Sequence, residues 1–159
     1  MRYPEDELYD LVQAVNPRAV INRKTVRAIR KSQKRLPNTS QYRYSIILES
    51  MPGGPYRGPE TIFYDKYNMT QYSQLHPLRI PRGKYKKTWD LIRAIYDRYG
   101  FLLRTEDIIN DFVSPERGVR LATLCILYEG TIRIVYDDII YLEDVLTNTE
   151  LDGFIQEIL

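Results

Sequence analysis

The same order of predicted helix, turn and strands occurs twice in the sequence. The clearer copy is residues 87–138, which begin KTWDLIRAIYDRYG, where apolar residues recur at helical spacing: Trp89, Ile92, Ile95, Tyr96 and Tyr99. Thr88 is a suitable cap for the start of this helix, and Gly100 can end it in the left-handed conformation. A short turn headed by Thr105 follows. Two β-like runs, at residues 119–128 and 131–137, complete the copy.

The first half of the chain repeats this order. Residues 10–15 read DLVQAV and match residues 90–95, which read DLIRAI. A predicted strand at residues 42–49 corresponds to residues 120–127. At one constant offset, four further residues match, namely Gly58, Ile62, Tyr64 and Asp65 with Gly130, Ile134, Tyr136 and Asp137. This self-similarity predicts two copies of one helix–turn–strand–strand unit.

We therefore predict an α+β fold made of two similar helix–turn–strand–strand repeats, each with a small antiparallel sheet. The first repeat spans residues 1–67, with a helix that starts at Pro4, stops at Asn16-Pro17 and carries the apolar stripe Leu8, Leu11, Val12 and Val15. Its strands are residues 42–49 and 61–67. Residues 68–86 are predicted to be a connector, residues 87–138 the second repeat, and residues 139–159 a C-terminal docking extension.

A basic segment is the candidate binding surface of the first repeat. Residues 23–34 are predicted to form a helix, capped by Asn22, whose only apolar positions are Val26 and Ile29. Its wide cationic face is open to three interpretations: an ordinary solvated face, docking on an acidic protein surface, or contact with a phosphate backbone. Residues 18–41 lack aromatic side chains, which weakens binding to single strands. The candidate residues are Arg23, Arg27, Arg30, Lys31, Lys34 and Arg35.

Charge is distributed unevenly, although the net charge is only +2. Residues 18–57 contain ten Lys or Arg and one acid, a charge of +9, whereas residues 137–159 contain seven acids and no base, a charge of −7. The two ends should attract each other or the ends of another copy. We expect the apolar side chains of the acidic tail to dock on the domain or on a neighbour: Leu151, Phe154, Ile155, Ile158 and Leu159.

Composition narrows the class of protein further. The chain contains fourteen tyrosines, which are typical either of half-buried strand edges or of protein interfaces. Its single cysteine, Cys125, excludes an internal disulfide and is expected to be a buried thiol. The N-terminus has no signal-peptide pattern, and no apolar run approaches the roughly 20 residues of a membrane span. We expect folding in a reducing cytoplasm and no membrane partner.

The sequence offers little for catalysis. It lacks a glycine-rich phosphate loop, and its single histidine, His76, lies in the proline-bounded connector. One His and one Cys do not make a metal site. A divalent ion between Asp65 and Asp137, with or without enzymatic activity, is a weaker hypothesis that requires the repeats to pack about a pseudo-twofold axis. We expect no cofactor, no resident metal and no enzymatic activity.

Three short motifs carry a resemblance to a known group of proteins. They are Tyr64-Asp65-Lys66-Tyr67-Asn68-Met69, the helix from Asp90-Leu91 to Tyr99-Gly100 with Leu103 and Glu106-Asp107-Ile108, and Leu151-Asp152-Gly153-Phe154. With these, most of the chain resembles a small repeated structural module of virion proteins from large (jumbo) tailed bacteriophages. Residues 22–35 depart from that module, whose corresponding turn is acidic. The resemblance implies a non-enzymatic component of a virus particle.

The function we expect is therefore assembly. The chain would be a virion structural protein of the capsid, neck, tail or baseplate, made in the host cytoplasm and present in several copies. Its partners would be other virion proteins, with homo-oligomeric contacts between copies. The alternative is a nucleic-acid-binding accessory protein that uses residues 22–35, whose affinity would fall steeply with salt.

Overall fold

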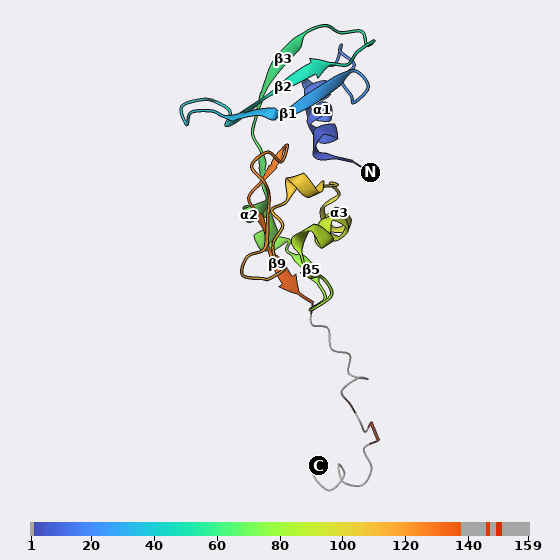
Figure 1. The fold of residues 1–159 in the computed structure, drawn as a ribbon, viewed down its shortest axis with the longest axis vertical. Coiled ribbons are helices and arrows are strands. Elements are labelled where there is room, and N and C mark those ends of the chain that lie inside the picture. Colours follow the sequence, from blue (N-terminus) through green and yellow to red (C-terminus); the bar gives the residue numbers. More distant parts are fainter. Residues whose placement is uncertain (1, 138–145, 147–148, 151–159) are drawn as a thin grey trace.

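The structure is a computed structural model of the 159-residue chain, and it describes residues 2–137, 146, 149 and 150. It has an α+β fold arranged as two lobes along the long axis of the molecule (Figure 1). The first lobe contains helix α1 (Pro4–Val15) and a three-stranded antiparallel sheet in the order β1-β2-β3. These strands are β1 (Val26–Arg35), β2 (Tyr44–Ser50) and β3 (Pro59–Tyr64).

Helix α1 confirms the helix predicted near the N-terminus. Pro4 occupies the first turn together with three acidic residues, which suit the positive end of the helix dipole. Leu8 and Val12 are buried as expected, but Leu11 and Val15 are exposed. Tyr9 is buried instead, and its hydroxyl accepts a 3.0 Å hydrogen bond from the Ala28 backbone amide of β1. The helix thus faces the sheet through a narrower stripe than the sequence predicts.

The prediction of a basic helix at residues 23–34 is wrong, because most of this segment forms β1. It pairs antiparallel with β2 from Val26↔Ser50 to Ile29↔Ile47, and pairing resumes after an irregularity at Lys34↔Ser45. Two apolar residues, Val26 and Ile29, are too few to stabilise a helix by packing, and both are β-branched. A helix with so few apolar residues would not be stable, whereas pairing with β2 satisfies the backbone hydrogen-bonding groups of the segment.

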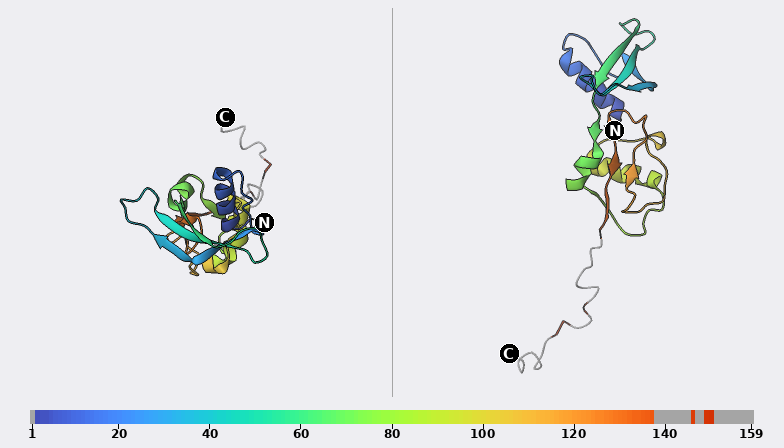
Figure 2. Two further views of the ribbon diagram at one scale, coloured as in Figure 1. Left: turned by 90° about the horizontal axis from the view of Figure 1, so that it is seen from above. Right: turned by 90° about the vertical axis from the view of Figure 1, so that its left-hand side faces the viewer.

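The second lobe contains short elements that come from the rest of the described chain. Two pairs of strands are parallel, β4 with β7 and β5 with β9, and β6 pairs antiparallel with β8. Figure 2 shows this lobe below the sheet of the first lobe in its right-hand view. Its elements are β4 (Tyr67–Asn68), α2 (Met69–Leu75), β5 (Leu78–Ile80), η1 (Thr88–Leu91), α3 (Ile92–Tyr99), η2 (Thr105–Asp107), β6 (Val119–Arg120), β7 (Tyr128–Glu129), β8 (Thr131–Ile132) and β9 (Ile134–Tyr136).

The second lobe confirms some predicted elements and corrects others. The helix and its left-handed end at Gly100 (φ 86°) are present, and so is the turn at Thr105. Thr88 is the first residue of η1 rather than its cap, with Lys87 before it. Residues 68–86 are not a simple connector, because Met69, Leu78 and Ile80 are buried in the core.

The structure does not confirm the internal repeat. The predicted strand at residues 42–49 is present as β2, whereas its proposed counterpart at residues 120–127 is mostly turns between β6 and β7. The first lobe has one long sheet, and the second has three separate strand pairs. Short apolar patterns recur by chance, and here similar sequence patterns lie in segments whose strands pair differently.

One apolar core joins the two lobes. Leu8, Ile46 and Tyr64 of the first lobe belong to the same buried cluster as Leu91, Ile95 and many residues of the second lobe. A smaller cluster lies under α1 and consists of Tyr9, Val12, Val26 and Leu48. Because a shared core resists separation, the lobes behave as one folding unit.

Ion pairs cross the same junction. The Arg104 guanidinium donates a 3.1 Å hydrogen bond to Glu5 of α1 and lies 3.8 Å from the centroid of the Tyr3 ring. Arg30 of β1 pairs with Asp107 of η2, whose other carboxylate oxygen accepts a 2.7 Å hydrogen bond from the Arg104 amide. Asp107 is almost completely buried, so its charge depends on these contacts.

We predict that Arg30→Met lowers the free energy of unfolding by about 2–4 kcal/mol, because it leaves a buried carboxylate without its cation. The matched control is Arg27→Met, which removes an exposed pair with Glu49 and should cost less than about 1 kcal/mol. Urea denaturation of both variants measures the difference. Equal destabilisation by the two substitutions would contradict the role given to the Arg30–Asp107 pair.

Candidate functional site

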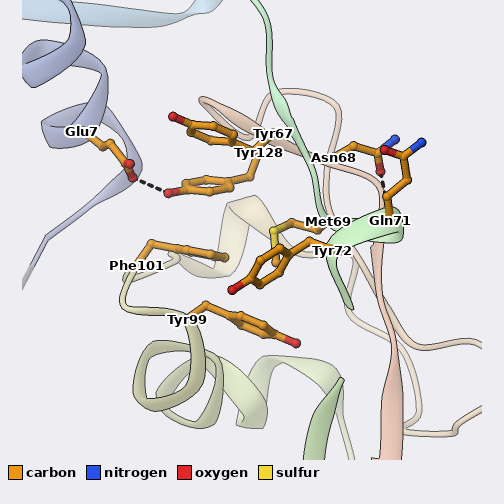
Figure 3. A pocket seen from close by; sticks show the side chains of 9 residues that line it. All are labelled: Glu7, Tyr67, Asn68, Met69, Gln71, Tyr72, Tyr99, Phe101 and Tyr128. Carbon is orange, nitrogen blue, oxygen red and sulfur yellow. Dashed lines mark hydrogen bonds between the residues drawn. The ribbon is translucent and has the colours of Figure 1, made fainter. Parts of the chain in front are cut away.

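An aromatic cleft opens at the junction of the lobes (Figure 3). Its volume is about 510 Å³. Elements far apart in the sequence build it, from α1 of the first lobe to β4, α2, β7 and the end of α3 in the second. We call this site the aromatic cleft, and its lining residues are Glu7, Tyr67, Asn68, Met69, Gln71, Tyr72, Tyr99, Phe101 and Tyr128.

The rings of the cleft form one continuous series. Phe101 stacks on Tyr128 with their centroids 4.0 Å apart, and Tyr67 lies 5.7 Å beyond Tyr128. On the other side, Tyr99 stacks at 5.9 Å from Phe101, and Tyr72 meets Tyr99 edge-on at 6.0 Å. Tyr67 and Tyr72 are 47% and 53% exposed, so the two ends of the series face solvent.

Glu7 supplies the only formal charge among the lining side chains. It lies on α1 and accepts a hydrogen bond from the Tyr128 hydroxyl, as Figure 3 shows. Burial, aided by this carboxylate, raises the pKa of Tyr128 well above its usual value. Burial also raises the pKa of Tyr99 to about 12. Both phenols are therefore neutral near pH 7, and the cleft as a whole is apolar with one acidic group at its edge.

Local sequence features place these residues. Gly100 has a positive φ that ends α3 and turns the chain between Tyr99 and Phe101, so that both rings reach the cleft. Gly130 allows a close approach, since a Cβ there would clash with the Thr70 hydroxyl oxygen. That oxygen accepts a 2.8 Å hydrogen bond from the Thr131 amide, which fixes the start of α2 beside β7 and β8.

A second cleft, of about 390 Å³, differs from the aromatic cleft in the charge of its lining residues. Lys34, Arg35 and Lys66 line it together with Tyr44 and Glu129. The Lys66 ammonium donates a 2.9 Å hydrogen bond to the Thr123 carbonyl and lies 4.7 Å from the centroid of the Tyr44 ring. Burial lowers the pKa of Lys66, and it raises the pKa of Tyr44, whose hydroxyl donates to Glu129.

The structure does not bring the predicted basic residues together on one face. Arg23 pairs with Asp6 of α1, Arg27 pairs with Glu49 at 2.8 Å, and Arg30 pairs with Asp107. These three cations bind carboxylates of their own chain.

The other three predicted cations, Lys31, Lys34 and Arg35, are exposed. They have no carboxylate partner among the residues that the structure describes. Lys34 and Arg35 line the second cleft. Three of the predicted cations thus form ion pairs within the chain, and the other three remain available to a partner.

A family model matches residues 2–157 of the chain, and its description is a family of unknown function, DUF7941. The chain belongs to this DUF7941 family. The match spans both lobes, so the aromatic cleft lies wholly inside the region that defines DUF7941. No curated protein and no solved structure matches the chain significantly.

Other residues singled out in the DUF7941 sequence have structural contacts. Cys125 is a buried thiol, as predicted. The His76 ring packs against Tyr72 at 4.7 Å, and the Asp65 carboxylate accepts a 2.9 Å hydrogen bond from the Arg43 amide. Within residues 2–137, 146, 149 and 150, no three His, Cys, Asp or Glu side chains gather as metal ligands. Asp137 is exposed just after β9.

Two further predictions concern the ends of the chain and membranes. The tail residues Leu151, Phe154, Ile155, Ile158 and Leu159 lie outside the described residues, so their docking stays a prediction. In the described part of the chain, none of the helices combines the length and apolar character needed to cross a bilayer.

The aromatic cleft itself was not predicted from the sequence. The abundance of tyrosine was the only signal, and it left an interface and ordinary strand edges as alternatives. Tyr99 was assigned to a helical stripe, and nothing in the pattern linked Glu7 to Tyr128, which is 121 positions away.

We predict that Cys125 of the native protein resists alkylation by iodoacetamide near pH 8. Burial raises the pKa of the Cys125 thiol from 9.0 to about 11, so the thiolate fraction falls about 100-fold, and access is also blocked. Mass spectrometry should show one adduct after unfolding in urea and almost none before it. Labelling of the folded chain at the unfolded rate would show that Cys125 is accessible.

Proposed function

We propose that this DUF7941 protein is a structural component of a tailed-bacteriophage particle and that it acts by contacts between proteins rather than by catalysis. The observation that supports the contact role most directly is the aromatic cleft. It presents two half-exposed tyrosines in a cavity of about 510 Å³ at the junction of the lobes. Concave aromatic surfaces of this kind are preferred sites for anchoring side chains of a partner protein.

The resemblance to virion modules supports the particle setting. Its motifs supply four of the lining residues of the aromatic cleft, namely Tyr67, Asn68, Met69 and Tyr99. The residues that suggest a virion protein are thus also residues that shape the binding surface. Under this proposal, the protein resides in the virion.

Charge provides a second contact between neighbours. Lys31, Lys34 and Arg35 are exposed on the first lobe, whereas residues 138–159 contain six acids and no base. We expect the acidic extension of one copy to bind an adjacent subunit through charge and through its apolar side chains. Contacts between different surfaces of identical copies generate rings when the rotation closes.

The direct test is deletion of residues 147–159. We predict a protein that still folds, because the deletion leaves every described helix and strand in place, but that shows little incorporation into purified particles. Particle fractions from a gradient, analysed by mass spectrometry, give the amount incorporated. Incorporation of the truncated chain at the normal level would contradict the role of the extension. Absence of the intact chain from particles would contradict the proposed function.

The nucleic-acid alternative makes a different prediction. Each phosphate neutralised makes the slope of log affinity against log salt more negative by about 0.9, so the seven Lys and Arg of residues 22–35 would give a slope of about −6.3 if all were free. With Arg23, Arg27 and Arg30 paired within the chain, the remaining four allow about −3.6 at most. We therefore expect weak binding in gel-shift titrations at two salt concentrations, and a slope of about −6 would favour the alternative.

A further inference from the structure

We infer that the aromatic cleft receives a lysine or arginine side chain from a different protein of the assembly. This inference rests on the proposed function, because it names the chemistry of the neighbour that the cleft binds. The cleft joins an exposed aromatic surface to a single carboxylate, and that combination suits a cation carried on an apolar stem.

The charge of the residues that line the cleft argues against a nucleotide as its ligand. Among the described residues that line the cleft, Glu7 is the only one with a charged side chain, and Asn68 and Gln71 are the only amides. A nucleotide could stack its base on Tyr67 or Tyr72, but its phosphate would meet no Lys or Arg among the lining residues. A basic side chain instead gains attraction from Glu7 and stacks its methylenes on the rings.

The ring faces also point to a cation. Elsewhere the chain covers its own rings with cations, as in Lys87 over Phe112 at 3.6 Å and Lys66 over Tyr44 at 4.7 Å. Among the described residues, no Lys or Arg lies over Tyr67, Tyr72, Phe101 or Tyr128. Arg98 lies 6.0 Å from the centroid of the Tyr99 ring, and Phe101 and Tyr128 are buried, so the ring surface open to a partner is that of Tyr67 and Tyr72.

The source of the cation is a different chain rather than a second copy. Under the proposed function, Lys31, Lys34 and Arg35 of one copy meet the acidic extension of the next, and Arg23, Arg27 and Arg30 pair with carboxylates of their own chain. The basic segment of a second copy is therefore already engaged. A separate protein with an exposed basic segment meets no such competition.

The test is a titration of the isotope-labelled full-length chain, followed by amide chemical shifts in nuclear magnetic resonance. The probes are N-acetyl-lysine methylamide, its neutral analogue N-acetyl-norleucine methylamide, which lacks the ammonium group, and thymidine monophosphate. We expect saturable shifts at Tyr67, Tyr72 and Tyr128, with binding of the lysine probe at least about fivefold tighter than that of norleucine. Thymidine monophosphate should bind most weakly.

Four variants locate the binding. Tyr72→Ala should weaken the lysine probe about fivefold or more, whereas Tyr72→Phe should retain its affinity because the ring face is kept. Glu7→Gln should reduce the preference for lysine over norleucine. Tyr42→Ala is the matched control, since Tyr42 is an exposed tyrosine outside the cleft and its loss should change nothing.

Each contrary result overturns the inference in a defined way. Equal binding of norleucine and lysine would make the cleft a simple apolar site, and tighter binding of thymidine monophosphate would make it a base-stacking site. Self-association in sedimentation that Tyr72→Ala abolishes would identify a second copy as the occupant. None of these results bears on truncation of residues 147–159, so failure here is distinguishable from failure of the proposed function.

Discussion

The contact between the two lobes determines where every candidate binding group lies. Leu8 and Ile46 join an apolar core that is mostly formed by the second lobe, and the buried Asp107 carboxylate holds Arg30 of β1 from the other side. A buried carboxylate is costly without its cation, so this pair fixes the orientation of β1 as well as its stability. With the lobes held in this way, Glu7 reaches Tyr128, and the aromatic cleft closes around their hydrogen bond.

The same junction explains which groups the side chains of the basic segment contact. In a helix, the basic residues would share one binding face. A strand separates them, because its successive side chains point to opposite sides. Arg23 and Arg30 bind carboxylates of α1 and η2, and Lys34 and Arg35 line the second cleft. The basic residues of this segment therefore form ion pairs within the chain and also provide a smaller surface for partners.

Local signals predicted the elements that depend on local physics. The helix ending at Gly100, the strand at residues 42–49 and the buried Cys125 follow from periodicity, glycine conformation and an apolar run. The segment that became β1 was mispredicted because Val26 and Ile29 fit both a helix and a strand, and only the pairing with β2 decides between them. The cleft depends on pairings such as Glu7 with Tyr128, which no local pattern encodes.

The central claim is that the aromatic cleft at the junction of the lobes docks another protein of a virus particle. The most direct measurement is the amount of Tyr72→Ala protein found in purified particles, compared with Tyr72→Phe and the unmodified chain at equal expression. The account predicts a loss of about fivefold or more for alanine and normal incorporation for phenylalanine. Incorporation of the alanine variant at the level of the unmodified chain would contradict it.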